Sequence, residues 1–97
     1  MEVWVADIDG RAVGFAAVKL HTDRSMGEIY MLAVDPDYQR RGIGSALTEV
    51  ATDWIREAGL PIAVIDSGGD EGHAPARHVY EKAGYTPMPI VRYFKAL

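Results

Sequence analysis

The apolar and polar positions in the first third of the chain follow the pattern of short strands. Residues 3–8 predict one strand, and residues 12–20, in which Val13, Phe15 and Ala17 recur at every second position, predict its partner. The Asp9-Gly10 pair between them predicts a tight hairpin. The segment 28–34 is almost continuously apolar, so we expect a third strand that is covered on both faces. The polar segment 21–27 predicts the loop that joins the second strand to the third.

The longest regular pattern predicts an amphipathic helix that stops at Gly59, a typical C-cap glycine. Its apolar positions follow the i, i+3, i+4 spacing without interruption: Ile43, Ala46, Leu47, Val50, Ala51, Trp54, Ile55 and Ala58. Residues 62–66 then predict a short buried strand, and a second helix should begin near Pro75 and end at Gly84. Residues 90–95 predict a terminal strand. The order strand, helix, strand predicts an α/β fold.

Composition indicates one globular domain over residues 1–97, because 48% of the residues are apolar and 25% are charged. The chain contains no cysteine, which excludes disulfides, thiolate-rich zinc sites and an acyl-cysteine intermediate. No metal site is predicted. Any chemistry must therefore use hydroxyl, carboxylate, imidazole or amine groups.

Net charge and hydropathy indicate which classes of binding partner the sequence does not favour. The net charge of −4 weighs against a general nucleic-acid binder, which presents a broad basic face. No apolar run approaches the roughly 18 residues that span a bilayer, and the first residues lack the order of a signal peptide. We therefore expect a cytoplasmic protein that binds neither nucleic acid nor membrane, with any anion site confined to the adjacent pair Arg40 and Arg41.

Two glycines lie between the third predicted strand and the long helix. Gly42 and Gly44 would allow a phosphate to approach the unpaired amides of a helix N-terminus, with Arg40 and Arg41 adding positive charge. The alternative is that the glycines only shape a tight turn. The dinucleotide pattern G-x-G-x-x-G does not fit, because Leu47 occupies the third glycine position, and the P-loop lysine is missing.

Two motifs together are specific for one family. Residues 39–47, QRRGIGSAL, resemble the coenzyme-A loop Q/R-x-x-G-x-G/A of the GNAT superfamily of N-acetyltransferases, and residues 73–85, HAPARHVYEKAGY, resemble its second signature. The resemblance implies a GNAT-like mixed, mostly antiparallel sheet flanked by helices. It also implies that the sheet is splayed between the strands at 28–34 and 62–66, with acetyl-CoA in the gap.

The same resemblance assigns residues to the acyl donor. The pantetheine arm would run along the strand that precedes the loop, and the diphosphate would lie on amides of the loop. The residues so assigned to acetyl-CoA are Leu32, Ala33, Val34, Gln39, Arg40, Arg41, Gly42, Gly44, Ser45 and His73. For His73, which replaces an asparagine common in the family, three roles stay open: a hydrogen bond to pantetheine, a helix cap, or a second base.

Two residues are candidates for the proton transfers of acetylation. Glu28 occupies a position at which several members place a catalytic glutamate; it would deprotonate the amine directly or through water, and the alternative is a solvated charge. Tyr80 matches the tyrosine that the family uses as general acid on the leaving thiolate, and the alternative is a core aromatic. His21 and His78 are expected to be ordinary loop and surface residues.

The resemblance implies an N-acetyltransferase that transfers an acetyl group from acetyl-CoA to a primary amine by direct attack in a ternary complex. Two alternatives stay open: a non-catalytic acyl-CoA-binding or interaction module, and an unrelated nucleotide-phosphate binder. The chain is N-terminally short for the family, because it begins near the second strand and lacks much of the acceptor-binding wall. A second chain would complete that wall, so we expect a homodimer.

Overall fold

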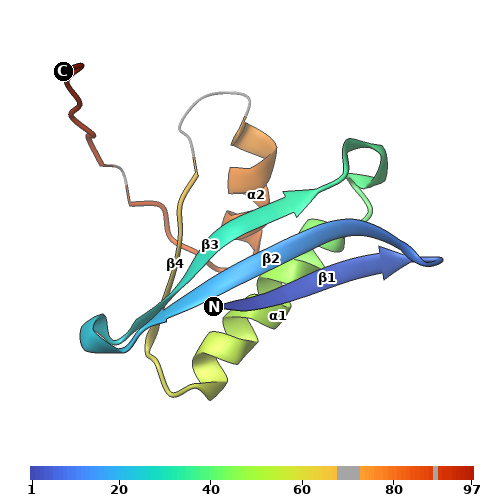
Figure 1. The fold of residues 1–97 in the computed structure, drawn as a ribbon, viewed down its shortest axis with the longest axis horizontal. Helices are drawn as coiled ribbons and strands as arrows, with labels where there is room; N and C mark the ends of the chain where they lie inside the picture. Colours follow the sequence, from blue (N-terminus) through green and yellow to red (C-terminus); the bar gives the residue numbers. More distant parts are fainter. Residues whose placement is uncertain (68–72, 89) are drawn as a thin grey trace.

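The computed structural model describes residues 1–67, 73–88 and 90–97. Its regular elements are the strands β1 (Glu2–Ile8), β2 (Arg11–His21), β3 (Met26–Val34) and β4 (Ile62–Ile65), the helices α1 (Ile43–Glu57) and α2 (Ala74–Lys82), and the 3-10 turns η1 (Thr22–Arg24) and η2 (Pro36–Tyr38). The four strands form one sheet in the order β1-β2-β3-β4 (Figure 1). Strand β2 is antiparallel to both β1 and β3, and β4 is parallel to β3, so the predicted mixed, mostly antiparallel sheet is confirmed.

The predicted elements are present except at the C-terminus, but the strand expected to be buried at 62–66 is not buried: in β4, Ile62 is 52% exposed and the other residues are only partly buried. Asp9 and Gly10 both have positive φ angles, 51° and 82°, as the predicted two-residue hairpin requires. The terminal strand predicted at 90–95 is wrong: residues 90–97 form no strand and run away from the sheet (Figure 1). A strand needs a neighbouring edge for its backbone hydrogen bonds, and this segment lies along none.

Helix α1 covers one face of the sheet and builds the core with it. The buried cluster between them consists of Val18, Ile29, Ala51 and Ile55. A Cβ atom on Gly27 would lie 2.5 Å from Ile55 Cγ1, so this glycine lets the helix approach β3 closely. Trp4 and Trp54 meet edge to face beside the cluster, with ring centroids 5.4 Å apart.

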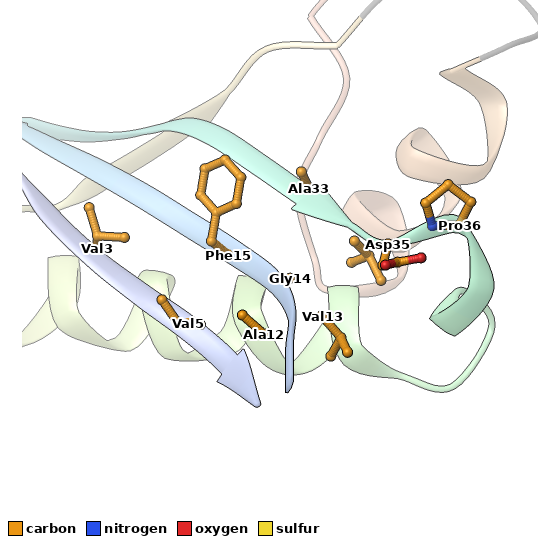
Figure 2. A pocket seen from close by; sticks show the side chains of 10 residues that line it. Val3, Val5, Ala12, Val13, Gly14, Phe15, Ala33, Asp35 and Pro36 are labelled. Atoms are coloured by element: carbon orange, nitrogen blue, oxygen red, sulfur yellow. The ribbon is translucent and has the colours of Figure 1, made fainter. Parts of the chain in front are cut away.

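No helix in the described residues covers the opposite face of β1 and β2, which we call the open face. Val3, Val5 and Phe15 lie on it, around a hollow with mainly apolar walls (Figure 2). In β3, Met31 is 47% exposed on the same face, so the expectation that this strand is covered on both faces is wrong. An apolar face without a cover gives the same sequence pattern as a buried one.

The sheet forks between β3 and β4. The two strands pair only from Met26 and Ile62 to Ile29 and Ile65, and a bulge in the β2–β3 register leaves Tyr30 as an extra residue at that point. A bulge bends its strand and increases the local twist, so β3 turns away from β4 beyond it (Figure 1). The predicted splay is therefore present, and the second half of β3 has a free edge.

Candidate active site

The loop between β3 and α1 is held by its own side chains. Asp35 Oδ1 accepts a hydrogen bond from the backbone N–H of Asp37 at 2.9 Å, which fixes the start of η2. Gln39 Nε2 donates to the carbonyl oxygen of Val34 at 3.2 Å. The side chain of Gln39 thus ties the loop back to the end of β3.

The structure requires glycine at only one of the two glycine positions in the loop. Gly42 is the N-cap of α1 and has a φ of 80°, so the turn itself requires glycine there. Gly44 lies inside the helix, and the nearest atom to a Cβ built on it is Val34 Cγ2 at 3.8 Å, an ordinary contact. Neither the backbone nor packing among the described residues requires glycine at position 44. A small residue at this position leaves the amides of the first helical turn open to the approach of a ligand.

The first turn of α1 offers backbone donors. No side chain caps the helix at Gly42 in the described chain, so its first N–H groups are available to an anion. Ser45 is half-buried in this turn. The amides and the helix dipole both favour a negatively charged ligand at this end.

Arginines flank this helix terminus. Arg41 Cζ lies 4.9 Å from the ring centroid of Tyr38, and Arg11 Cζ lies 5.7 Å from the same centroid. Arg11 also pairs with Asp35 at 3.5 Å. Arg40 is exposed and has a φ of 65°, a left-handed conformation unusual for a residue with a side chain. The Tyr38 ring therefore orients Arg41, while the side chain of Arg40 is exposed.

The free edge of β3 leads directly into this loop. Leu32, Ala33 and Val34 pair on one side with β2, through Ala16, Phe15 and Gly14 in that order, and β4 does not reach their other side. Backbone groups that point away from β2 can bind an extended ligand as a neighbouring strand would. The end of this edge lies beside the first turn of α1, since a Cβ atom on Gly44 would be 3.8 Å from Val34 Cγ2.

Glu28 and His21 form a pair that sequence reasoning missed. Glu28 is on β3 one residue before the pairing with β4 ends, and it faces away from α1 because its neighbour Gly27 faces the helix. His21 is not a loop residue: it is the last residue of β2 and pairs with Met26. Its Nε2 lies 2.9 Å from Glu28 Oε1. The only signal was a histidine and a glutamate seven positions apart around a predicted turn.

Two more side chains lie on the same face of the hairpin. Lys19 is directly opposite Glu28 in the β2–β3 register. Its Nζ atom lies 4.1 Å from the ring centroid of Tyr30, the bulged residue. Lys19, His21, Glu28 and Tyr30 thus share one face of the β2–β3 hairpin.

Tyr80 and His73 are both on α2. Tyr80 is half-buried, and burial raises the pKa of its phenol above the ordinary value of 10.0, so the hydroxyl is protonated at neutral pH. His73 is the exposed N-cap residue, and its side chain does not cap the helix, which removes one of its three candidate roles. His78 is exposed, as expected.

Tyr85 fixes the end of α2 against α1, a role that the sequence did not indicate. Thr52 Oγ1 donates to the carbonyl oxygen of Thr48 at 2.7 Å and therefore accepts from Tyr85 Oη at 2.6 Å. The Tyr85 N–H in turn donates to the carbonyl oxygen of Tyr80 at 3.0 Å. The helix that carries Tyr80 is thus anchored to the helix that follows the glycine loop.

Comparison with known proteins assigns the family. Residues 1–85 match the acetyltransferase (GNAT) family. The chain belongs to this family. Mycothiol acetyltransferase from Thermomonospora curvata is 38% identical over 88 residues, which are 91% of this chain and 29% of that protein. The Streptomyces coelicolor mycothiol acetyltransferase is 37% identical over 82 residues, 84% of this chain and 26% of that protein. This GNAT chain therefore spans less than a third of the length of these relatives.

Solved structures share the GNAT fold of this chain. An aminoglycoside acetyltransferase from an uncultured soil metagenomic sample, in complex with sisomicin, has a TM-score of 0.82 at 23% identity and covers 98% of this chain and 64% of its own. The acetyltransferase AAC(6')-Iy, in complex with the bisubstrate analogue CoA-S-monomethyl-acetylneamine, has a TM-score of 0.83 at 19% identity and covers 98% of this chain and 68% of its own. The predicted fold class is confirmed. In the described residues, no helix of this GNAT chain is long and apolar enough to cross a bilayer.

Proposed function

We propose that this GNAT chain transfers the acetyl group of acetyl-CoA to a primary amine by direct attack in a ternary complex. The observation that carries the proposal is Gly44, a helical glycine that neither backbone nor packing requires, at the uncapped N-terminus of α1. A small residue among free amides suits the close approach of a diphosphate. The absence of cysteine favours direct attack over an acyl-cysteine intermediate.

The acyl donor would be held by backbone groups more than by side chains. The diphosphate is proposed to accept hydrogen bonds from the amides of Arg41, Gly42, Gly44 and Ser45, with the Arg41 guanidinium adding charge. The pantetheine arm is proposed to line the free edge of β3 along residues 32–34, which the fork leaves open. Gln39 and Arg40 are the remaining loop residues proposed to bind the acyl donor. His73, at the start of α2, stays a predicted contact of pantetheine.

Glu28 and Tyr80 are proposed to move the protons. An ammonium substrate must lose one proton before its nitrogen can attack, and Glu28 accepts that proton directly or through water. Attack forms the C–N bond, and collapse of the tetrahedral intermediate breaks the C–S bond. Tyr80, protonated at neutral pH, gives its proton to the leaving sulfur and recovers the second proton that the nitrogen loses. The products are one amide, one CoA thiol and one proton in solvent.

A second copy of the chain is proposed to complete the acceptor side. The open face around Val3, Val5 and Phe15 is apolar, and β1 and β4 are both edge strands, features that favour association of small sheets. The acceptor class is proposed as a small-molecule or peptide amine. A cytoplasmic location stays a prediction from the sequence.

Turnover with amines tests the proposal. CoA release would be followed with a thiol reagent in the presence of acetyl-CoA and, in turn, sisomicin, a peptide with N-terminal alanine and a lysine peptide. We expect amine-dependent CoA release with at least one of them, and the acetylated amine in the mass spectrum. Calorimetric binding of acetyl-CoA without release for any amine would instead support a non-catalytic acyl-CoA-binding module. Competition by simple nucleotides as strong as by CoA would support a nucleotide-phosphate binder.

A further inference from the structure

The carboxylate of Glu28 is held by the neighbouring strand. His21 Nε2 and Glu28 Oε1 are 2.9 Å apart, and the two side chains are 27% and 28% exposed, so the contact is partly shielded from water. An ionised carboxylate only accepts hydrogen bonds, so the hydrogen must be on Nε2, in either the neutral or the charged imidazole. His21 therefore fixes one of the two carboxylate oxygens.

The register of the hairpin produces this contact. His21 pairs with Met26, so its side chain is the diagonal neighbour of Glu28 on the same face of β2 and β3. Diagonal neighbours lie within reach of long side chains, and the turn η1 begins at the residue after His21. The contact is thus built on two paired strands, which position side chains more rigidly than a loop does.

The nearest lysine does not compete for the carboxylate. Lys19 is directly opposite Glu28, yet its ammonium lies over the Tyr30 ring, and within residues 1–67, 73–88 and 90–97 no ion pair joins it to Glu28. The Lys19 ammonium therefore occupies neither carboxylate oxygen of Glu28. Oε2 of Glu28 has no hydrogen-bond partner among the described residues.

We infer that His21 is a positioning residue for Glu28. Its Nε2–H holds Oε1, so that the carboxylate keeps one orientation and Oε2 is available to accept the proton of the attacking amine or of an intervening water. This inference rests on the proposed function, in which Glu28 is the base. His21 itself contacts neither substrate nor cofactor in this scheme and acts only through Glu28.

A double-mutant cycle tests the inference on whichever of the three probe amines the parent acetylates. His21→Phe keeps a ring and removes the donor, and kcat should fall about tenfold, as expected for loss of a hydrogen bond to a charged group. KM for acetyl-CoA should stay at the parent value, because the cofactor loop is untouched. In a Glu28→Gln background, itself roughly 10²-fold slower, His21→Phe should cost less than about twofold more.

Two further variants separate positioning from a structural effect. His21→Gln retains an N–H donor at a similar reach and should recover most of kcat, while His78→Phe makes the same exchange at an exposed histidine on α2 and should change nothing. Melting temperatures of all variants would be recorded alongside. If His21→Phe turns over at the parent rate, or slows the Glu28→Gln enzyme as much as the parent, the inference is wrong while the proposed function stands. If the parent acetylates no amine, both fail.

Discussion

At the scale of the residue, Tyr80 combines partial burial with a protonated hydroxyl. Burial raises its pKa above 10.0, so the neutral phenol is the form favoured in the folded protein. The resulting contribution to stability is fully present below pH 10 and is lost as the pH rises through the raised pKa. Tyr80 therefore keeps its hydroxyl proton over the whole neutral and mildly alkaline range.

We predict that Tyr80→Phe lowers kcat by roughly 10²-fold and leaves acetyl-CoA binding unchanged, because only the proton donor is removed. The parent should show no alkaline loss of kcat below about pH 10 that depends on Tyr80. Steady-state kinetics across pH, with calorimetry of acetyl-CoA as the binding control, measure both effects. A Tyr80→Phe enzyme as fast as the parent would make Tyr80 only a packed aromatic.

Single residues also show what the sequence could predict about the site. The glycine loop was predictable because its residues are adjacent in the chain and their chemistry is local. The pairing of His21 with Glu28 was not, because it depends on the register of two strands, which a shift of one residue would change. The role of Tyr85 was hidden for a similar reason: its partner Thr52 is 33 positions away.

At the scale of the element, two substitutions of different size at Gly44 test the proposed diphosphate site in the first turn of α1. Gly44→Ala should raise the free energy of unfolding by about 0.5–1 kcal/mol, because alanine is the better helix former and a Cβ has room 3.8 Å from Val34 Cγ2. Gly44→Val should weaken acetyl-CoA binding at least ~10-fold, since its branched side chain stands among the amides. Denaturant melts and calorimetry measure the two effects.

The alanine variant is the control for the valine variant. Valine and glycine differ by less than about 0.5 kcal/mol in helix propensity, so Gly44→Val should fold like the parent. Gly44→Ala is expected to bind acetyl-CoA within a few-fold of the parent, as the G/A alternative in the family loop implies. Normal binding by a folded Gly44→Val protein would remove the proposed diphosphate site.

Elements were predictable where their pattern is local. The apolar spacing of α1 and the Asp9-Gly10 turn depend only on neighbouring residues, and both predictions are confirmed. The strand expected at 90–95 had suitable residues but no neighbouring edge, and pairing is not a local property. The prediction that β3 is covered on both faces was wrong for the same reason, because an apolar run does not indicate which face of a strand packs against another element.

At the scale of the whole molecule, the open face predicts association. We expect a dimer in sedimentation, and we expect Val5→Asp, at a position 59% exposed on the open face, to shift it toward monomer. Val50→Asp is the matched control, because Val50 is 45% exposed on α1, the element that covers the other face. A parent that sediments as a monomer at every concentration would contradict this arrangement.

The fork in the sheet also has a thermodynamic consequence. Beyond Ile29 no strand in the described chain lies on the outer edge of β3, so a pantetheine arm bound there would take the place of a strand. The ligand would then be part of what keeps the chain folded: at a free concentration 100 times its Kd it adds about 2.7 kcal/mol to the free energy of unfolding. Small domains have only about 5–15 kcal/mol in total. The lifetime of this protein in a cell would therefore follow the supply of acetyl-CoA, falling when the metabolite is scarce.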